Sequence, residues 1–219
     1  MNLRAEGFPT ELMLLGNALA LGLLVWRARK VAWLSLSQAQ LTGWLGASTL
    51  IAVIWQLKTG IQPGLSFHLL GASVLTLVCG RDKALVGMAG VVLANCANGS
   101  ADWLAAGWSW LLGPLVGILL ADRLLRLSEQ RLPANYFAFF FANGFFGAAL
   151  SFIAAALCLL GFHALAGRYA PGYLLEEVLP YYLLFAWSEA FSSGLIMAML
   201  IIYRPQWVES FDDRRYLSQ

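Results

Sequence analysis

Charged residues are scarce in this sequence. Only 12% of its 219 residues are Asp, Glu, Lys or Arg, whereas 60% are hydrophobic and the mean hydropathy is +0.69. Soluble domains have roughly twice this share of charged residues, because charge covers the surface that faces water. The apolar stretches fill nearly the whole chain and leave no room for a soluble catalytic domain. We therefore expect a single transmembrane domain over residues 1–219.

Residue types that usually carry catalysis or bind metals are also few. The chain has two histidines and three cysteines, and Cys79, Cys96 and Cys158 lie in separate apolar stretches without a C-x-x-C spacing. Such cysteines are typical of small buried hydrophobic residues. No His-x-x-x-His, Glu-x-x-His, nucleophile elbow or phosphate loop is present, so we predict that the protein is not an enzyme. The basic residues are dispersed rather than gathered in one patch, which argues against nucleic-acid binding.

Seven apolar stretches follow one another along the chain. They predict an all-α integral membrane protein with about seven transmembrane helices, at residues 8–26, 39–57, 65–80, 84–97, 103–121, 136–163 and 178–203. A helix needs about 20 apolar residues to cross the core of a bilayer. The third and fourth stretches are shorter, so we expect broken or short helices that face protein or a water-filled cavity.

The connections between these stretches alternate between rich and poor in Lys and Arg. One side collects eleven of the 14 basic residues: Arg27, Arg29, Lys30, Arg81, Lys83, Arg123, Arg126, Arg131, Arg204, Arg214 and Arg215. The other side has only Arg4, Lys58 and Arg168. Cytoplasmic loops are rich in basic residues, so the split predicts the N-terminus outside and the C-terminus in the cytoplasm. Acidic residues precede the first apolar stretch and basic residues follow it, the reverse of a signal peptide, so we expect an uncleaved first helix.

His68 is the first candidate for a functional site. It is predicted one turn into the third stretch, directly after a Gly/Pro-rich loop, where its imidazole could meet an entering ion or bond a loop carbonyl. His163, at the outer end of the sixth stretch, is more typical of interfacial packing. Asn95, Asn98 and Asp102 could supply oxygen ligands on the outer side, although such residues more often form caps and turns.

Glu189 lies near the middle of the seventh stretch. A carboxylate at that depth is costly and usually faces the interior of the bundle, where it pairs or carries protons. Two interpretations remain open from the sequence: a structural hydrogen-bonding hub, or part of an ion pathway.

The order of motifs resembles the CbiM/NikM-type membrane subunits of energy-coupling-factor transporters for cobalt and nickel. The resemblance rests on Pro63-Gly64, His68-Leu69-Leu70-Gly71, Gly113-Pro114, Glu189-Ala190 and Tyr203-Arg204-Pro205, and it covers most of the chain. It is most similar to a divergent bacterial branch of permeases whose C-terminal motif matches Tyr203–Tyr216.

The resemblance implies a site and a set of partners. In that family the N-terminus enters the bundle from outside, and a divalent transition metal is held by the terminal amine, the amide and imidazole of the second residue, and the histidine that matches His68. The corresponding residues here are Met1, Asn2 and His68, so one imidazole is replaced by a carboxamide. The implied partners are a membrane coupling subunit and ABC ATPases, in the bilayer of the bacterial inner membrane.

Two functions follow from these observations. The first is a substrate-binding membrane component of a cobalt- or nickel-type importer that binds its metal at the outer side. The second is a membrane accessory or assembly subunit that has kept the fold without transport. The retained His68 and its loop favour the first, and Asn2 favours the second, because a carboxamide is a poor ligand for these metals.

Overall fold

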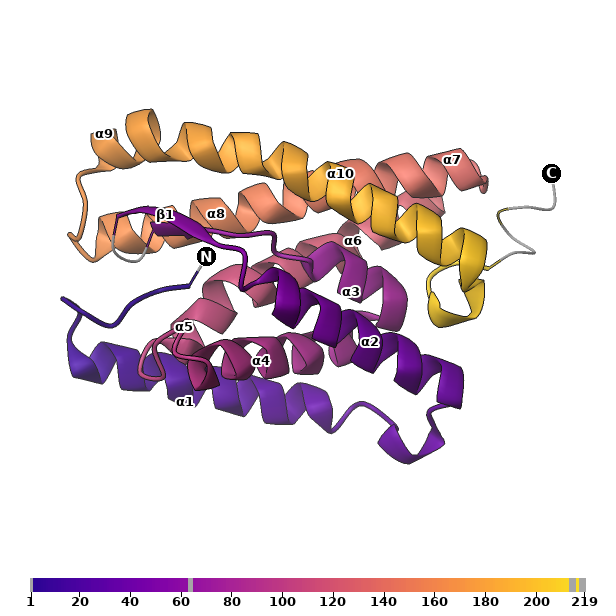
Figure 1. Ribbon diagram of the computed structural model, residues 1–219, viewed down its shortest axis with the longest axis horizontal. Coiled ribbons are helices and arrows are strands. Elements are labelled where there is room, and N and C mark those ends of the chain that lie inside the picture. Colours follow the sequence, from indigo (N-terminus) through magenta and orange to yellow (C-terminus); the bar gives the residue numbers. More distant parts are fainter. Residues whose placement is uncertain (1, 63–64, 213–215, 217–219) are drawn as a thin grey trace.

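The helices run side by side along the long axis of the molecule (Figure 1). The structure is a computed structural model, and it describes residues 2–62, 65–212 and 216. In Figure 1, β1, α5 and α9 lie at one end of the bundle, and α7 lies at the other. The predicted helical character is confirmed, with one exception, a short β-hairpin.

Two helices form the N-terminal part of the bundle. The first is α1 (Thr10–Ala28), which begins after Pro9, and it is followed by the short η1 (Trp33–Ser35) and by α2 (Gln38–Ile54). A capping box fixes the start of α2, since Ser37 Oγ accepts from the Gln40 amide and the Gln40 side chain accepts from the Ser37 amide.

The third predicted span differs most from its expected form. Its first residues form β2 (Leu65–Phe67), which pairs antiparallel with β1 (Thr59–Gln62), and helix α3 starts only at Ala72 and ends at Cys79. The prediction that His68 lies one turn into a helix is therefore wrong. Gly71 precedes α3 with φ of +71°, a left-handed conformation that breaks the regular backbone before the helix.

A second group of helices follows α3. It consists of α4 (Arg81–Ala97), α5 (Ala106–Trp110), η2 (Leu111–Leu115) and α6 (Val116–Arg131). The widened turn η2 contains Pro114, whose ring nitrogen cannot donate a hydrogen bond, and this accounts for the interruption between α5 and α6.

The last part of the chain forms two long, nearly continuous helices. One runs through α7 (Tyr136–Phe139), η3 (Phe140–Phe146) and α8 (Gly147–Leu165). The other runs through α9 (Pro171–Tyr173), η4 (Leu174–Val178) and α10 (Leu179–Tyr203), and the short η5 (Pro205–Trp207) follows it.

Three of the described helices are long and apolar enough to cross a membrane. They span Thr10–Ala28, Tyr136–Leu165 and Pro171–Tyr203. Large apolar side chains are exposed along them, for example Leu21 at 62% and Phe191 at 64%. Such an apolar surface is stable in contact with lipid rather than with water, so the fold is that of a helical membrane protein.

Helix α3 is the centre of the molecule, because all eight of its residues are buried. Its C-terminal carbonyl groups are bonded by the segment after η5: the Glu209 amide donates to Val78 O at 3.0 Å, and the Ser210 amide and hydroxyl donate to Leu77 O at 3.2 and 2.7 Å. The last carbonyl groups of a helix have no partners within it, so the C-terminal segment completes α3 by bonding those of Leu77 and Val78.

Candidate functional site

The N-terminal segment enters the bundle and is held there by three hydrogen bonds to its backbone. The Asn2 amide donates to Ser66 Oγ at 3.1 Å, and the Leu3 amide donates to Ser109 Oγ at 2.9 Å. The Ala5 amide donates to Asp102 Oδ2 at 3.1 Å. Asn2 and Leu3 are buried, which is unusual for residues so close to a chain end.

His68 lies in the extended stretch between β2 and α3 and is fully buried. Its Nδ1 is 3.0 Å from Leu69 O, and its ring lies 4.2 Å from the Trp55 ring, centroid to centroid. A carbonyl oxygen only accepts, so this bond assigns the proton to Nδ1 and leaves the lone pair on Nε2. No described residue bonds Nε2. A buried imidazole oriented in this way presents one nitrogen to a metal ion.

Trp55 and Glu189 fix the backbone that carries His68. Trp55 Nε1 donates to Leu70 O at 3.2 Å. The Leu70 amide donates to Glu189 Oε2 at 2.7 Å, and the Gly71 amide donates to Glu189 Oε1 at 2.8 Å. Glu189 therefore faces the interior, where it is 2% exposed, and both of its carboxyl oxygens accept from the backbone just before α3. The geometry favours the structural-hub interpretation of this residue.

The side chain of Asn2 is buried in the same region as Ser66. Neither its Oδ1 nor its Nδ2 has a hydrogen-bond partner among the described residues. Buried polar atoms nearly always have a partner, so these two atoms and His68 Nε2 are available to a further polar group or ion. Met1, the other expected ligand, lies outside the described residues.

The remaining candidate residues lie elsewhere at this end of the bundle. Asn95 is buried and its Nδ2 bonds Val91 O at 3.1 Å, while Asn98 bonds Gln56 Oε1 at 2.7 Å. Asp102 accepts from the Ala5 and Leu104 amides, so its carboxylate anchors the N-terminal segment. His163 is buried and packs on other aromatic rings, Phe8 at 5.7 Å and Tyr169 at 5.5 Å.

Lys58 is a basic residue at the start of the hairpin. Lys58 Nζ donates to Ser100 O and so joins the start of the hairpin to the turn after α4. Partial burial, and in addition the Arg4 guanidinium, lower the pKa of Lys58. No residue pattern singles out Ser66, Ser109 or Trp55, because their roles depend on contacts with residues far along the chain.

The donor set is small. Among residues 2–62, 65–212 and 216, no group of three or more His, Cys, Asp or Glu side chains is placed to hold a metal ion. What this part of the chain offers is one imidazole nitrogen and the Asn2 carboxamide. Such a set can bind a cation, and it contains no nucleophile with an adjacent base.

Comparisons with known proteins agree with this architecture. Two solved structures, described as a transition metal transporter and a truncated transition metal transporter, each match with a TM-score of 0.75 and 19% identity. The first match covers 91% of this chain and 92% of the other, and the second covers 93% and 99%. At this identity the likeness shows a shared fold. No curated protein sequence matches the chain.

The family comparison covers nearly the whole chain. The model for the cobalt uptake substrate-specific transmembrane region, CbiM, matches residues 2–207, which include the N-terminal segment, His68 and Glu189. The chain is therefore a member of the CbiM family of transmembrane transport components.

Proposed function

We propose that this protein is the substrate-binding membrane component of an importer for a divalent transition metal. The observation that carries the proposal is that the buried N-terminal segment bonds Ser66, two residues before His68, whose Nε2 has no partner among the described residues. The metal would be the transported substrate. His68 Nε2 would supply one ligand and the N-terminal segment the others.

The surroundings of His68 support this function. Ser66, Ser109 and Asp102 hold the N-terminal segment by its backbone, which leaves the Asn2 side chain available. Trp55 and Glu189 hold the backbone at Leu70 and Gly71, just after His68. A site that binds its substrate selectively needs ligands held in place by such supporting contacts.

The proposed arrangement in the membrane follows the charge distribution. Seven spans with the N-terminus outside would open the site outwards, and the eleven basic residues of the other side would face the cytoplasm. A membrane coupling subunit and ABC ATPases would supply the energy, and the location would be the bacterial inner membrane.

The test is a titration of purified protein with nickel, cobalt, copper and zinc. The wild type should bind at least one of these ions, and His68→Ala should abolish that binding, whereas His163→Ala, which removes the other buried histidine, should not. An N-terminal extension should abolish binding as fully as His68→Ala. Asn2→His should strengthen binding of nickel or cobalt. Affinity should fall as the pH falls, because nitrogen ligands bind metals only when deprotonated.

The identity of residue 2 favours a second candidate function. A carboxamide is a poor ligand for cobalt and nickel, so Asn2 suits an accessory or assembly subunit that has kept the fold without metal binding. Should the wild type bind none of the four metals above the His68→Ala background, the importer function is refuted and the accessory function takes its place.

A further inference from the structure

A solvent-open cavity lies at the end of the bundle opposite the N-terminal segment. It has a volume of about 370 Å³ and is formed by the connection between α1 and α2 together with the junction of α3 and α4. Three cationic side chains, Lys30, Arg81 and Lys83, line it, and Asp82 is the acidic residue among the lining side chains. At about 30 Å³ per water molecule, this space accepts a phosphate group together with several waters.

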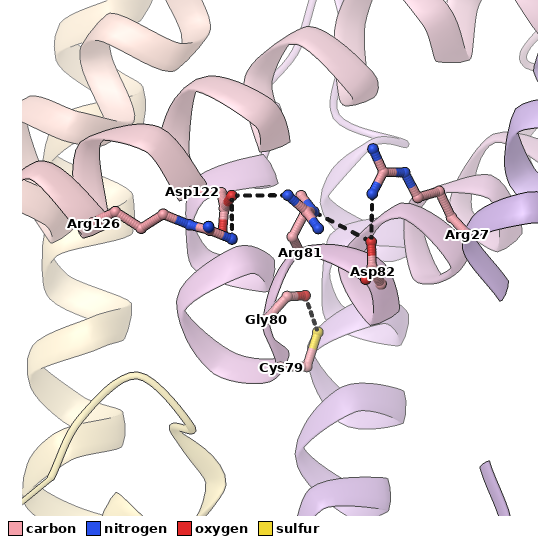
Figure 2. A network of polar contacts seen from close by, with 7 residues as sticks. All are labelled: Arg27, Cys79, Gly80, Arg81, Asp82, Asp122 and Arg126. Carbon is pink, nitrogen blue, oxygen red and sulfur yellow. Dashed lines mark hydrogen bonds and ion pairs between the residues drawn. The ribbon is translucent and has the colours of Figure 1, made fainter. Parts of the chain in front are cut away.

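The cations around this cavity exceed the carboxylates that pair with them. Figure 2 shows a chain of ion pairs from Arg27 through Asp82, Arg81 and Asp122 to Arg126, with N···O distances of 3.1–3.4 Å. Three guanidinium groups therefore share two carboxylates, and this network has an excess of one positive charge. Arg81 stands at its centre and lines the cavity.

Lys30 adds a second unbalanced charge. Among the described residues no carboxylate pairs with it, and its Nζ lies 4.2 Å from the centre of the Trp26 ring. Lys83, in contrast, pairs with Glu209. An anion in the cavity would thus meet Lys30 on one wall and Arg81 on the other.

The backbone on the floor of the cavity also favours an anion. Helix α4 begins at Arg81, and its N-cap residue is Gly80, which has φ of +75° and no side chain that could bond the first-turn amides. The first amides of a helix lack internal acceptors and carry the positive end of the helix dipole, so they bind phosphate groups readily. The charge and the backbone therefore point to the same kind of ligand.

The position of the cavity indicates where the anion comes from. Trp26 is 49% exposed at the end of α1, one of the three helices able to cross a membrane. Leu34, in the connection that forms one wall, is fully exposed. Tryptophan at a helix end marks the boundary between acyl chains and headgroups, and an exposed leucine beside it suits the same boundary. In a bilayer crossed by α1, this arrangement would put the cavity at the depth of the lipid phosphates.

We propose that this cavity binds the headgroup of an anionic phospholipid, with the phosphate between Lys30, Arg81 and the first turn of α4. Basic pockets between transmembrane helices are a recurrent way of holding such lipids. The proposal is independent of the metal site, because none of its residues contacts His68 or the N-terminal segment.

The experiment measures thermal unfolding of the full-length protein in a neutral detergent. Dioctanoyl phosphatidylglycerol should raise the melting temperature in a saturable way, and dioctanoyl phosphatidylcholine should not. Lys30→Gln should weaken the phosphatidylglycerol affinity about fivefold, the effect of one basic residue near a lipid surface. Arg29→Gln is the matched control: it removes the same charge one residue away, from an exposed side chain outside the cavity, and should leave the affinity unchanged.

Three results would overturn the proposal. Equal losses of phosphatidylglycerol affinity in the Lys30→Gln and Arg29→Gln variants would indicate a general attraction to anionic lipid rather than binding at one site. Stabilisation by inorganic phosphate as strong as that by phosphatidylglycerol, at equal concentration, would assign the cavity to a soluble anion. Stabilisation by poly-glutamate without stabilisation by the lipid would assign it to an acidic protein segment.

Discussion

Replacement of Glu189 tests how the segment that carries His68 is held. Both carboxyl oxygens accept backbone hydrogen bonds, at 2.7 Å from Leu70 and 2.8 Å from Gly71, and the side chain is 2% exposed. In Glu189→Leu the two amides lose their acceptor in an apolar surrounding. An unsatisfied buried donor costs about 1–3 kcal/mol, so we expect a loss of about 2–6 kcal/mol in the free energy of unfolding.

Glu189→Gln has a smaller but definite expected effect. A carboxamide has one acceptor oxygen, and its NH₂ group would face the second backbone amide, donor against donor. We expect a loss of about 1.5–3 kcal/mol, the contribution of one hydrogen bond to a charged group. If the residue served only to carry protons, the Gln variant would instead keep its full stability.

The assay is denaturant unfolding in detergent micelles, followed by tryptophan fluorescence. Glu177→Leu is the control, because it removes an exposed carboxylate from the preceding turn η4 and should change the free energy of unfolding by less than about 0.5 kcal/mol. A Glu189→Leu variant as stable as this control would refute the assignment of the carboxylate as the acceptor of the Leu70 and Gly71 amides.

Three further predictions concern the topology and the backbone around the site. In a cysteine-free background, a cysteine in place of Gln62 or Gly172 should react with a membrane-impermeant thiol reagent added outside, whereas a cysteine in place of Arg131 should not. Labelling of the cysteine at position 131 from outside would contradict the seven-span arrangement. Gly71→Ala should cost about 1–3 kcal/mol in denaturant unfolding, since it places a side chain in a left-handed conformation, and an unchanged midpoint would show that the turn tolerates a Cβ. Asp102→Ala should speed hydrogen exchange of the amides in the N-terminal segment and leave the exchange of the α8 amides unchanged. Equal protection of the N-terminal amides in the wild type and the variant would exclude Asp102 as an anchor.

The helical, membrane-embedded character could be predicted from the sequence because it depends on composition and on the length of apolar stretches. The expectation that the third stretch is short or broken came from its length, which is below the roughly 20 apolar residues that cross a bilayer core. The hairpin could not be predicted, because its strands have four and three residues and show no alternation of apolar and polar side chains long enough to recognise.

The supporting contacts of the site could not be predicted for a different reason. Glu189 bonds the Gly71 amide across 118 positions, and Asp102 bonds the Ala5 amide across 97. In both bonds the partner is a backbone group, which every residue type possesses, so no residue pattern marks it. Asp102 was expected as an oxygen ligand or a turn residue, and only the fold shows that its carboxylate anchors the N-terminal segment.

The dependence of α3 on groups far along the chain has a consequence for biosynthesis. Glu189 bonds the backbone just before this helix, and residues 209 and 210 bond the carbonyl groups at its C-terminal end. The residues that carry these acceptors and donors are synthesised after α3, at 118 to 133 positions beyond the groups that they bond. The backbone on both sides of α3, including the stretch just after His68, is therefore completed only after residues 189–210 have been made, and a nascent chain that stops before them lacks these hydrogen bonds.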